Sequence, residues 1–229
     1  MIRNFTKDSD FLKREPALSR LLKTDELSAI PDIAFSDFCT DLRNDKGSIP
    51  ANVMIPFYFA QSKAITANDT ITGSFDDPYK RLNRLVIDKT VTVCTGTNKA
   101  ILKGSQDNTT FVKIGEITLD TSASQSVKFP SSFTYYQVDI EVGGALNMTT
   151  DLFLVESPFD HCIESLCLSY AYSQCIRTDD IFITLADKYR KEYEKRFQNL
   201  NFWYDSDSNG VNDMNVEGMN NLTVFKRWG

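Results

Sequence analysis

Apolar residues in the first fifty positions have the spacing of helices. Ala34, Phe38 and Leu42 recur every four residues, which predicts a helix that begins near Pro31 and ends around Gly47. Shorter helices are predicted before it, with Phe11 and Leu12 in the first and three leucines in the second: Leu18, Leu21 and Leu22. The N-terminal part of the chain is therefore expected to be helical.

Helical spacing returns after Pro158. The first of two predicted helices there has an apolar face made by Ile163, Leu166, Cys167, Tyr170 and Ala171. The second begins near Asp179 and has a long apolar stripe of Leu185, Tyr189, Tyr193, Phe197 and Leu200. Its opposite face is charged, so this helix is expected to pack one side against the rest of the protein.

The middle of the chain has a different pattern. It is rich in Thr, Val, Ile, Phe and Tyr, and strands are predicted at 53–59, 70–75, 84–94, 111–119, 134–142 and 152–155. In the clearest of them Tyr136, Val138 and Ile140 alternate with polar residues, which is the period of a half-buried strand. Short strands separated by polar turns predict an antiparallel sandwich.

Together these patterns predict an α+β fold in which a discontinuous helical bundle carries an inserted antiparallel β-sandwich. The predicted parts are N-terminal helices at 1–50, the sandwich at 51–157, C-terminal helices at 158–200 that complete the bundle, and an extended tail at 201–229. This division predicts that the two ends of the chain pack together.

Composition narrows the classes of function. The net charge is −6, and the charges of both signs are mixed without a basic block, which argues against nucleic-acid binding by a charged face. No stretch approaches the roughly 20 apolar residues of a membrane span, and the N-terminus has no signal-peptide core, so no membrane partner and folding in the cytoplasm are expected. The five irregularly spaced cysteines are expected to be reduced, mostly buried thiols.

No catalytic constellation is visible in the sequence. The single histidine, His161, precedes Cys162 at the predicted start of a helix, where adjacent side chains point in different directions and do not easily form a nucleophile pair. None of the common catalytic or nucleotide-binding motifs is present. The chain is therefore predicted not to be an enzyme; an enzyme built on an unrecognised site stays open as an alternative.

One segment of the tail resembles a calcium-binding loop. Its matches to the first, third, fifth, sixth and ninth positions of an EF-hand loop are Asp205, Asp207, Asn209, Gly210 and Asp213. The twelfth position is Val216, and the acid that should stand there is displaced to Glu217. The segment is expected to be a solvated linker or, at most, a weak Ca²⁺ site, and no other cofactor is predicted.

The end of the tail is apolar and basic, and is a candidate docking element. Its residues are Val224, Phe225, Lys226, Arg227 and Trp228. Trp and Arg are enriched at binding hot spots, which favours docking on a partner. The alternative is that the aromatic residues fold back onto the protein's own helices.

Part of the predicted sandwich resembles galactose-binding-like (discoidin-type) domains. The resemblance lies in Leu102, Gly104, Ser105 and Asp107, followed by Phe111 and the strand at 135–140. In that family the run is mainly a turn with strands, so the resemblance implies the sandwich fold. As an alternative function, it implies a carbohydrate-binding module of a virion or surface assembly.

The two helical flanks resemble head–tail connector (adaptor or neck) proteins of tailed bacteriophages. The resemblance covers the N-terminal helices, the helix at 181–193 and the polar tail. It implies a structural subunit of the virion neck, in a ring of about twelve copies below the portal. The implied partners are the portal, neighbouring neck and tail proteins and further copies of the chain, with DNA only passing through; a mildly acidic chain suits such a channel.

Overall fold

The chain forms two compact units in a computed structural model that describes residues 3–46, 54, 56–74, 82–130, 132–175, 180–200, 202–204 and 214–216. One unit, called the helical unit here, comprises Met1–Met54 and Pro158–Gly229. The other, the sandwich unit, comprises Ile55–Ser157. No helix among the described residues is long and apolar enough to cross a membrane. The predicted α+β class, helices with an antiparallel β-sandwich, is confirmed.

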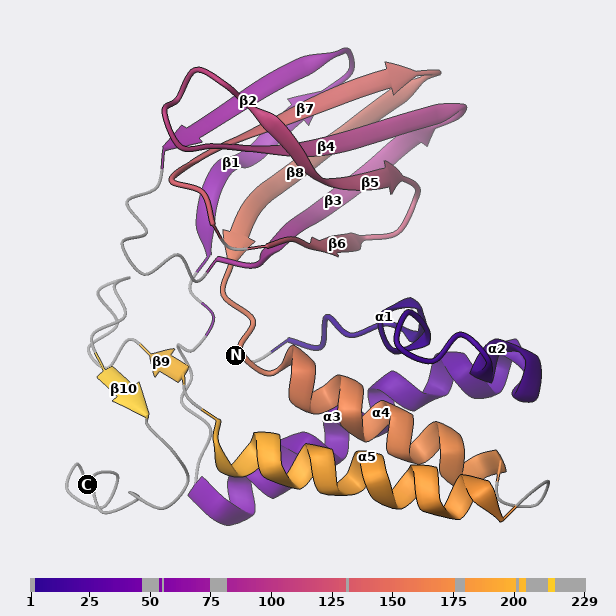
Figure 1. Cartoon of the computed structure of the whole chain (residues 1–229). Helices are drawn as coiled ribbons and strands as arrows, with labels where there is room; N and C mark the ends of the chain where they lie inside the picture. The colour runs from indigo at the N-terminus through magenta and orange to yellow at the C-terminus, as the bar shows by residue number, and fades with distance from the viewer. Residues whose placement is uncertain are drawn as a thin grey trace. The chain divides into compact units, whose positions relative to one another are not determined.

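The helical unit is built from both ends of the chain. Its helices are α1 (Asp8–Leu12), α2 (Leu18–Leu21), α3 (Thr24–Lys46), α4 (Asp160–Cys175) and α5 (Ile181–Gln198). Helix α4 packs against α3 and α5, and the short α1 and α2 also contact it (Figure 1). This position explains why α4 is buried nearly all round, with few of its residues exposed.

Helix α3 begins seven residues earlier than the sequence suggests. Pro31 was expected at the first turn, but the helix starts at Thr24 and Pro31 lies inside it. Pro31 has no N–H group, so the helix lacks one backbone hydrogen bond there. Burial of Ile30, which is complete, and of Leu27, which is nearly complete, offsets this cost. The predicted stripe further along the helix is correct, because Ala34, Phe38 and Leu42 are all fully buried.

Polar contacts tie the two halves of the helical unit together. Glu192 of α5 forms a 2.7 Å salt bridge with Arg14, which follows α1. Four tyrosines of α4 and α5 donate hydrogen bonds to three carboxylates of the N-terminal half: Tyr170 to Asp37, Tyr172 and Tyr189 to Glu15, and Tyr193 to Asp41. The N- and C-terminal segments are thus joined by directional bonds as well as by apolar packing.

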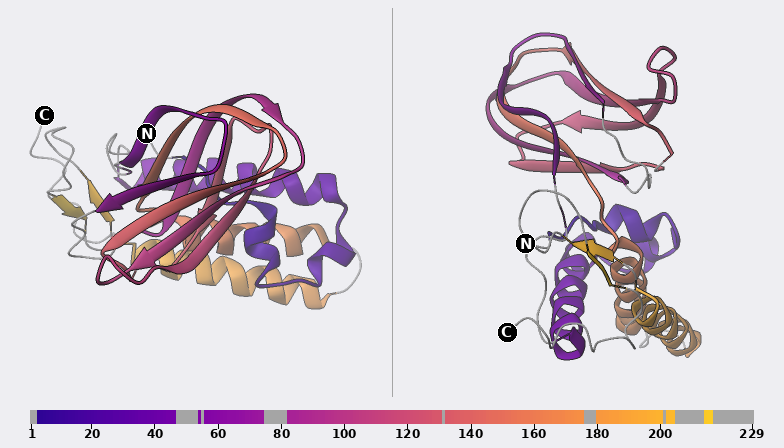
Figure 2. Two further views of the ribbon diagram at one scale, coloured as in Figure 1. Left: turned by 90° about the horizontal axis from the view of Figure 1, so that it is seen from above. Right: turned by 90° about the vertical axis from the view of Figure 1, so that its left-hand side faces the viewer.

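The sandwich unit consists of two four-stranded antiparallel sheets (Figure 2). Its strands are β1 (Phe57–Ile65), β2 (Asp69–Ser74), β3 (Arg84–Cys94), β4 (Thr97–Ser105), β5 (Val112–Leu119), β6 (Ser124–Lys128), β7 (Tyr135–Gly143) and β8 (Leu146–Val155). One sheet has the order β1-β8-β3-β6 and the other the order β2-β7-β4-β5. Alternate residues of both sheets face inward and form one apolar core, as the period of two requires.

The strand predictions are accurate where the alternation is strong. The interval 84–94 coincides with β3, and Tyr136, Val138 and Ile140 of β7 are buried as predicted. Strand β1 lies at Phe57–Ile65 instead of 53–59, and β8 extends back to Leu146. Strands β4 and β6 were missed: the first lies partly inside the run interpreted as a turn, and the second is short and mostly polar.

Candidate functional site

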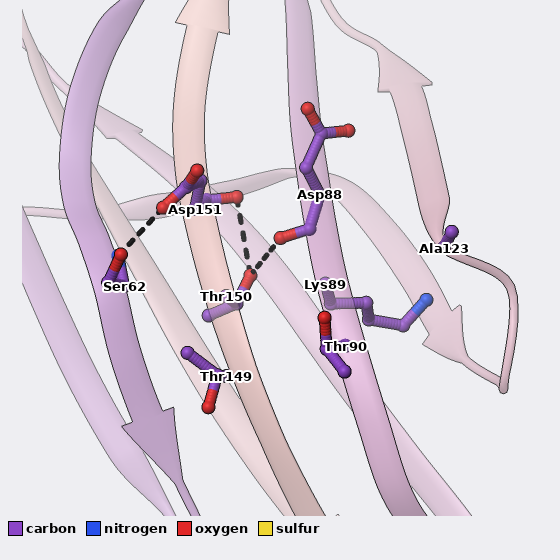
Figure 3. Close-up of a pocket in the computed structure, with 8 residues that line it drawn as sticks. All are labelled: Ser62, Asp88, Lys89, Thr90, Ala123, Thr149, Thr150 and Asp151. Carbon is purple, nitrogen blue, oxygen red and sulfur yellow. Dashed lines mark hydrogen bonds between the residues drawn. The ribbon is translucent and has the colours of Figure 1, made fainter.

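A polar hollow lies on the outer face of the sheet β1-β8-β3. It has a volume of about 320 Å³ and is lined by Ser62, Asp88, Lys89, Thr90, Ala123, Thr149, Thr150 and Asp151 (Figure 3). We call this set of residues the polar hollow. Its lining is made mostly of residues with carboxylate or hydroxyl side chains from three neighbouring strands, together with Lys89 of β3 and Ala123 from the loop before β6.

Two carboxylates face each other across the central strand pair of this sheet. Asp88 of β3 and Asp151 of β8 are direct partners in the antiparallel register. Like charges in such positions destabilise a sheet, so the pair is a local conflict between sequence and fold. Conflicts of this kind tend to occur at functional positions. The sequence gives no sign of the pair, because only the register of β3 with β8 makes these distant residues neighbours.

Each carboxylate is held by a hydrogen-bond donor from a flanking strand. The backbone N–H of Ser62 donates to Asp151 Oδ1 at 2.7 Å, and the hydroxyl of Ser124 donates to Asp88 Oδ1 at 2.6 Å. Ser62 has a positive φ of 49° and lies where the β1–β8 register shifts between Ala60 and Lys63. A β-bulge thus turns an N–H group of β1 toward the hollow, a device common beside binding sites.

Three threonines complete the lining. The Thr150 hydroxyl bonds the backbone carbonyls of Asp88 at 3.0 Å and of Asp151 at 3.2 Å, which fixes the backbone beneath the two carboxylates (Figure 3). Thr90 and Thr149 are register partners, and both are exposed. Their hydroxyls lie one row beyond the aspartates on the same face of the sheet.

Lys89, the one lysine of the lining, forms side-chain hydrogen bonds with β6 and the loop before it. The side chain of Lys89 is fully buried, and its ammonium group donates to the carbonyl of Ser122 and, at 2.8 Å, to the side-chain oxygen of Gln125. It also lies 3.6 Å from Asp120. Burial alone would raise the pKa of Asp120, but the hydrogen bonds from Ser122 and the charge of Lys89 outweigh burial, so the pKa is lower than usual. Lys89 therefore anchors the loop before β6 and leaves the face of the hollow dominated by hydrogen-bond acceptors and hydroxyls.

The residues weighed for catalysis are not arranged for it. The His161 side chain is exposed, with Nδ1 3.4 Å from Glu164 Oε2. Burial raises the pKa of the Cys162 thiol to about 12, the opposite of what a nucleophile requires. All five cysteines are free, and three of them are buried: Cys162, Cys167 and Cys175. Within the described ranges, no three His, Cys, Asp or Glu side chains converge as metal ligands would.

The galactose-binding-like run has a structural role in the sandwich. Gly104 and Ser105 end β4, and Asp107 occupies the turn that follows. The carboxylate of Asp107 accepts hydrogen bonds from the N–H groups of Thr110 and Thr109, each at 2.9 Å, and these bonds hold its pKa well below the usual range. The motif thus builds a turn of the sandwich, as the resemblance implied.

The candidate residues of the tail lie outside the described residues. This holds for the possible calcium ligands Asp205, Asp207, Asn209 and Asp213, and for the docking residues Val224, Phe225, Lys226, Arg227 and Trp228. The segment 205–213 is flanked by β9 (Phe202–Tyr204) and β10 (Met214–Val216), which pair antiparallel (Figure 1). The flanking elements are therefore strands, whereas an EF-hand loop joins two helices.

Comparison with known proteins finds similarity of structure only. No family model matches the sequence, and no curated protein matches it significantly. Similar solved structures include CpGH89CBM32-5 from Clostridium perfringens, in complex with GalNAc-β-1,3-galactose, with a TM-score of 0.28, 21% identity, and coverage of 39% of this chain and 68% of that one. A second is CBM32-3 from a family 31 glycoside hydrolase of the same organism, with a TM-score of 0.28, 13% identity, and coverage of 50% and 82%.

A third similar structure is the Yersinia pseudotuberculosis-derived mitogen, with a TM-score of 0.27, 13% identity, and coverage of 46% of this chain and 86% of that one. Two of these three carry the name CBM32. None of the three is a head–tail connector. TM-scores this low assign no function to the chain.

Proposed function

We propose that the chain is a non-catalytic assembly protein of two parts, a sandwich unit that binds carbohydrate and a helical unit that attaches it to other proteins. The observation that carries the first part is the polar hollow. Its facing carboxylates, Asp88 and Asp151, are fixed by donors from neighbouring strands. Carboxylate and hydroxyl oxygens can accept the several hydroxyl donors of a sugar without exchanging a proton or forming a covalent bond.

The arrangement suits recognition better than chemistry. Two hydroxyl groups of a ligand, one donating to Asp88 and one to Asp151, would each form a charge-assisted hydrogen bond without any covalent step. The charge of the hollow also disfavours anionic ligands such as uronic or sialic acids. Neutral sugars are therefore the ligands that we expect.

A glycan array followed by titration calorimetry tests this proposal. The wild-type chain should bind one or more neutral glycans, and D88N and D151N should each weaken binding about tenfold or more, the loss of one charge-assisted hydrogen bond. The matched control is E141Q, which removes an exposed carboxylate from β7 in the other sheet. An array without neutral glycan hits, or equal binding by all three variants and the wild type, would refute carbohydrate recognition at the hollow.

The helical unit favours a second function, that of a head–tail connector subunit in a tailed phage. Its two halves come from opposite ends of the chain and are joined by hydrogen bonds and a salt bridge. It also leaves three isoleucines exposed: Ile33 on α3, and Ile181 and Ile183 at the start of α5. Exposed β-branched apolar residues on a helix are suited to contacts with a neighbouring protein. The expected partners are the portal, neck and tail proteins, and further copies of the chain.

Negative-stain imaging of the purified chain, alone and mixed with its portal, tests this second function. Rings or collars on the portal would support it, and a strictly monomeric protein without affinity for virion components would contradict it. A truncation after Asn221 removes the predicted docking residues. If the tail docks on a partner, the truncated chain keeps its melting temperature and fails to assemble; a lower melting temperature with normal assembly would show that the tail belongs to the protein's own core.

A further inference from the structure

An exposed aromatic side chain lies on the same outer face as the polar hollow. Tyr58 of β1 is 41% exposed, whereas the other aromatic residues described in the sandwich unit are buried or half-buried. It is the register partner of Phe153 of β8, and the two ring centroids are 5.2 Å apart with an interplanar angle of 54°. Phe153 is only 4% exposed. The tyrosine ring is therefore supported by a buried neighbour and still offers surface to solvent.

The strand register places this ring beside the carboxylates. Phe153 follows Asp151 by two residues on β8, so both side chains point to the outer face. Two residues along a strand correspond to about 7 Å. Tyr58 thus stands one row of side chains away from the row of Asp151 and Asp88. Asp151 lies on the strand next to Tyr58, and Asp88 lies one strand further away.

We propose that Tyr58, which stands beside the polar hollow, is the stacking platform for a ligand held by its carboxylates, and that the ligand is an uncharged pyranose. The inference rests on the proposed carbohydrate binding of the sandwich unit. The apolar C–H face of the sugar would lie on the tyrosine ring, while hydroxyl groups at its other edge donate to Asp151 and Asp88. A flat aromatic face supplies apolar contact area, and the carboxylates fix the orientation, which is the usual division of roles in a small-molecule site.

If Tyr58 is the platform, the affinity for the sugar depends on whether the side chain at position 58 has a flat aromatic face. Tyr58→Phe keeps the aromatic face and should bind almost as well as the wild type. Tyr58→Leu keeps apolar contact with Phe153 but has no flat face, so it should weaken binding about tenfold or more. The matched control is Val112→Ala, which truncates a similarly exposed apolar residue of β5 in the other sheet and should leave binding unchanged.

The experiment uses the full chain and a panel of methyl glycosides of galactose, glucose, N-acetylgalactosamine and galacturonic acid. Titration calorimetry gives the affinities, and saturation-transfer NMR shows which sugar protons touch the protein. We expect a neutral glycoside to bind with its ring C–H protons most strongly saturated, and galacturonic acid to bind far more weakly.

Three results would overturn the inference. If Y58L binds like the wild type while D88N and D151N lose affinity, Tyr58 is not the platform, and carbohydrate binding at the hollow stands. If the galacturonic acid glycoside binds best, the assignment of an uncharged ligand is wrong. If the wild type binds no glycoside of the panel and no glycan of the array, this inference and the proposed function fall together. Melting temperatures of Y58F and Y58L close to that of the wild type exclude misfolding as the cause of any loss.

Discussion

Replacing Tyr193 by Phe tests whether the two ends of the chain form one cooperative unit. Tyr193 of α5 is 1% exposed, and its hydroxyl donates to Asp41 Oδ2 of α3 at 2.6 Å. Its ring packs against Phe197, with centroids 5.5 Å apart, and this contact survives the substitution. The variant therefore removes one hydrogen bond between the N- and C-terminal segments and little else.

The expected loss follows from the partner and its burial. A hydrogen bond to a charged group contributes about 1.5–3 kcal/mol. Asp41 is half-buried, so water can replace the lost donor in part, and we expect a loss of about 1–2 kcal/mol in the free energy of unfolding. For a chain of this size, each kcal/mol lowers the melting temperature by about 2–4 °C.

Urea unfolding followed by helical circular dichroism measures the effect. The matched comparison is Tyr170→Phe, which removes the hydrogen bond from half-buried Tyr170 to Asp37. Because Asp37 is exposed and water can replace the lost donor, this variant should cost less than Y193F. A double-mutant cycle with Asp41→Asn isolates the pair. Equal losses for Y193F and Y170F, or an unchanged cost of Y193F in the D41N background, would refute the claim that this bond holds the two segments together.

Three further outcomes are expected. Gly104→Ala should destabilise the sandwich by about 1–3 kcal/mol, because its Cβ would come within 2.5 Å of the Phe133 ring, whereas Gly115→Ala, whose nearest contact would be 3.2 Å, should cost less; thermal melts compare them. Burial and a hydrogen bond to a carboxylate raise the pKa of Tyr170 and of Tyr189 to about 12, above the unfolded value of 10.0. Their contribution to stability is full below about pH 10 and is lost as the pH rises toward 12. The tyrosinate absorbance of these two residues, obtained as the difference between the wild type and the Y170F and Y189F variants, should therefore appear in that window together with the loss of helical circular dichroism. Ionisation of Tyr170 or Tyr189 at pH 10 in a folded chain, seen in that difference, would contradict it. The sandwich unit expressed alone should melt in a single cooperative transition in calorimetry, since it has its own core, and a molten, non-cooperative product would show that it depends on the helices.

Local patterning in the sequence determines the type of most elements. The four-residue spacing of Ala34, Phe38 and Leu42 is enough to predict a buried helical face, and the alternation around Val138 is enough to predict a half-buried strand. Both patterns succeed because burial on one side imposes the period of the backbone on the sequence. The spacing of apolar residues changes from helical to strand-like near residue 51 and back near residue 157, which also indicates an insertion between two helical parts.

Boundaries depend on contacts that the local pattern does not contain. Proline is common in the first turn of a helix, so Pro31 suggests a helix start. Burial of the residues before it nevertheless extends α3 back to Thr24. The polar strand β6 pairs with β3 and so satisfies its backbone hydrogen bonds, although its side chains give no alternating signal. Such segments become regular because a neighbouring strand supplies their partners, and the neighbour is far away in the sequence.

The candidate site belongs wholly to the tertiary structure. Asp88 and Asp151 lie in different predicted strands, and nothing in either segment marks them as a pair. The register of β3 with β8 brings them face to face, and the bulge at Ser62 turns a backbone donor toward one of them. A shift of one residue in that register would send one carboxylate to the opposite face. The sequence thus determines which segments are helices and strands, whereas the pairing of strands, set by burial and turn geometry across the whole sandwich, decides which polar side chains meet.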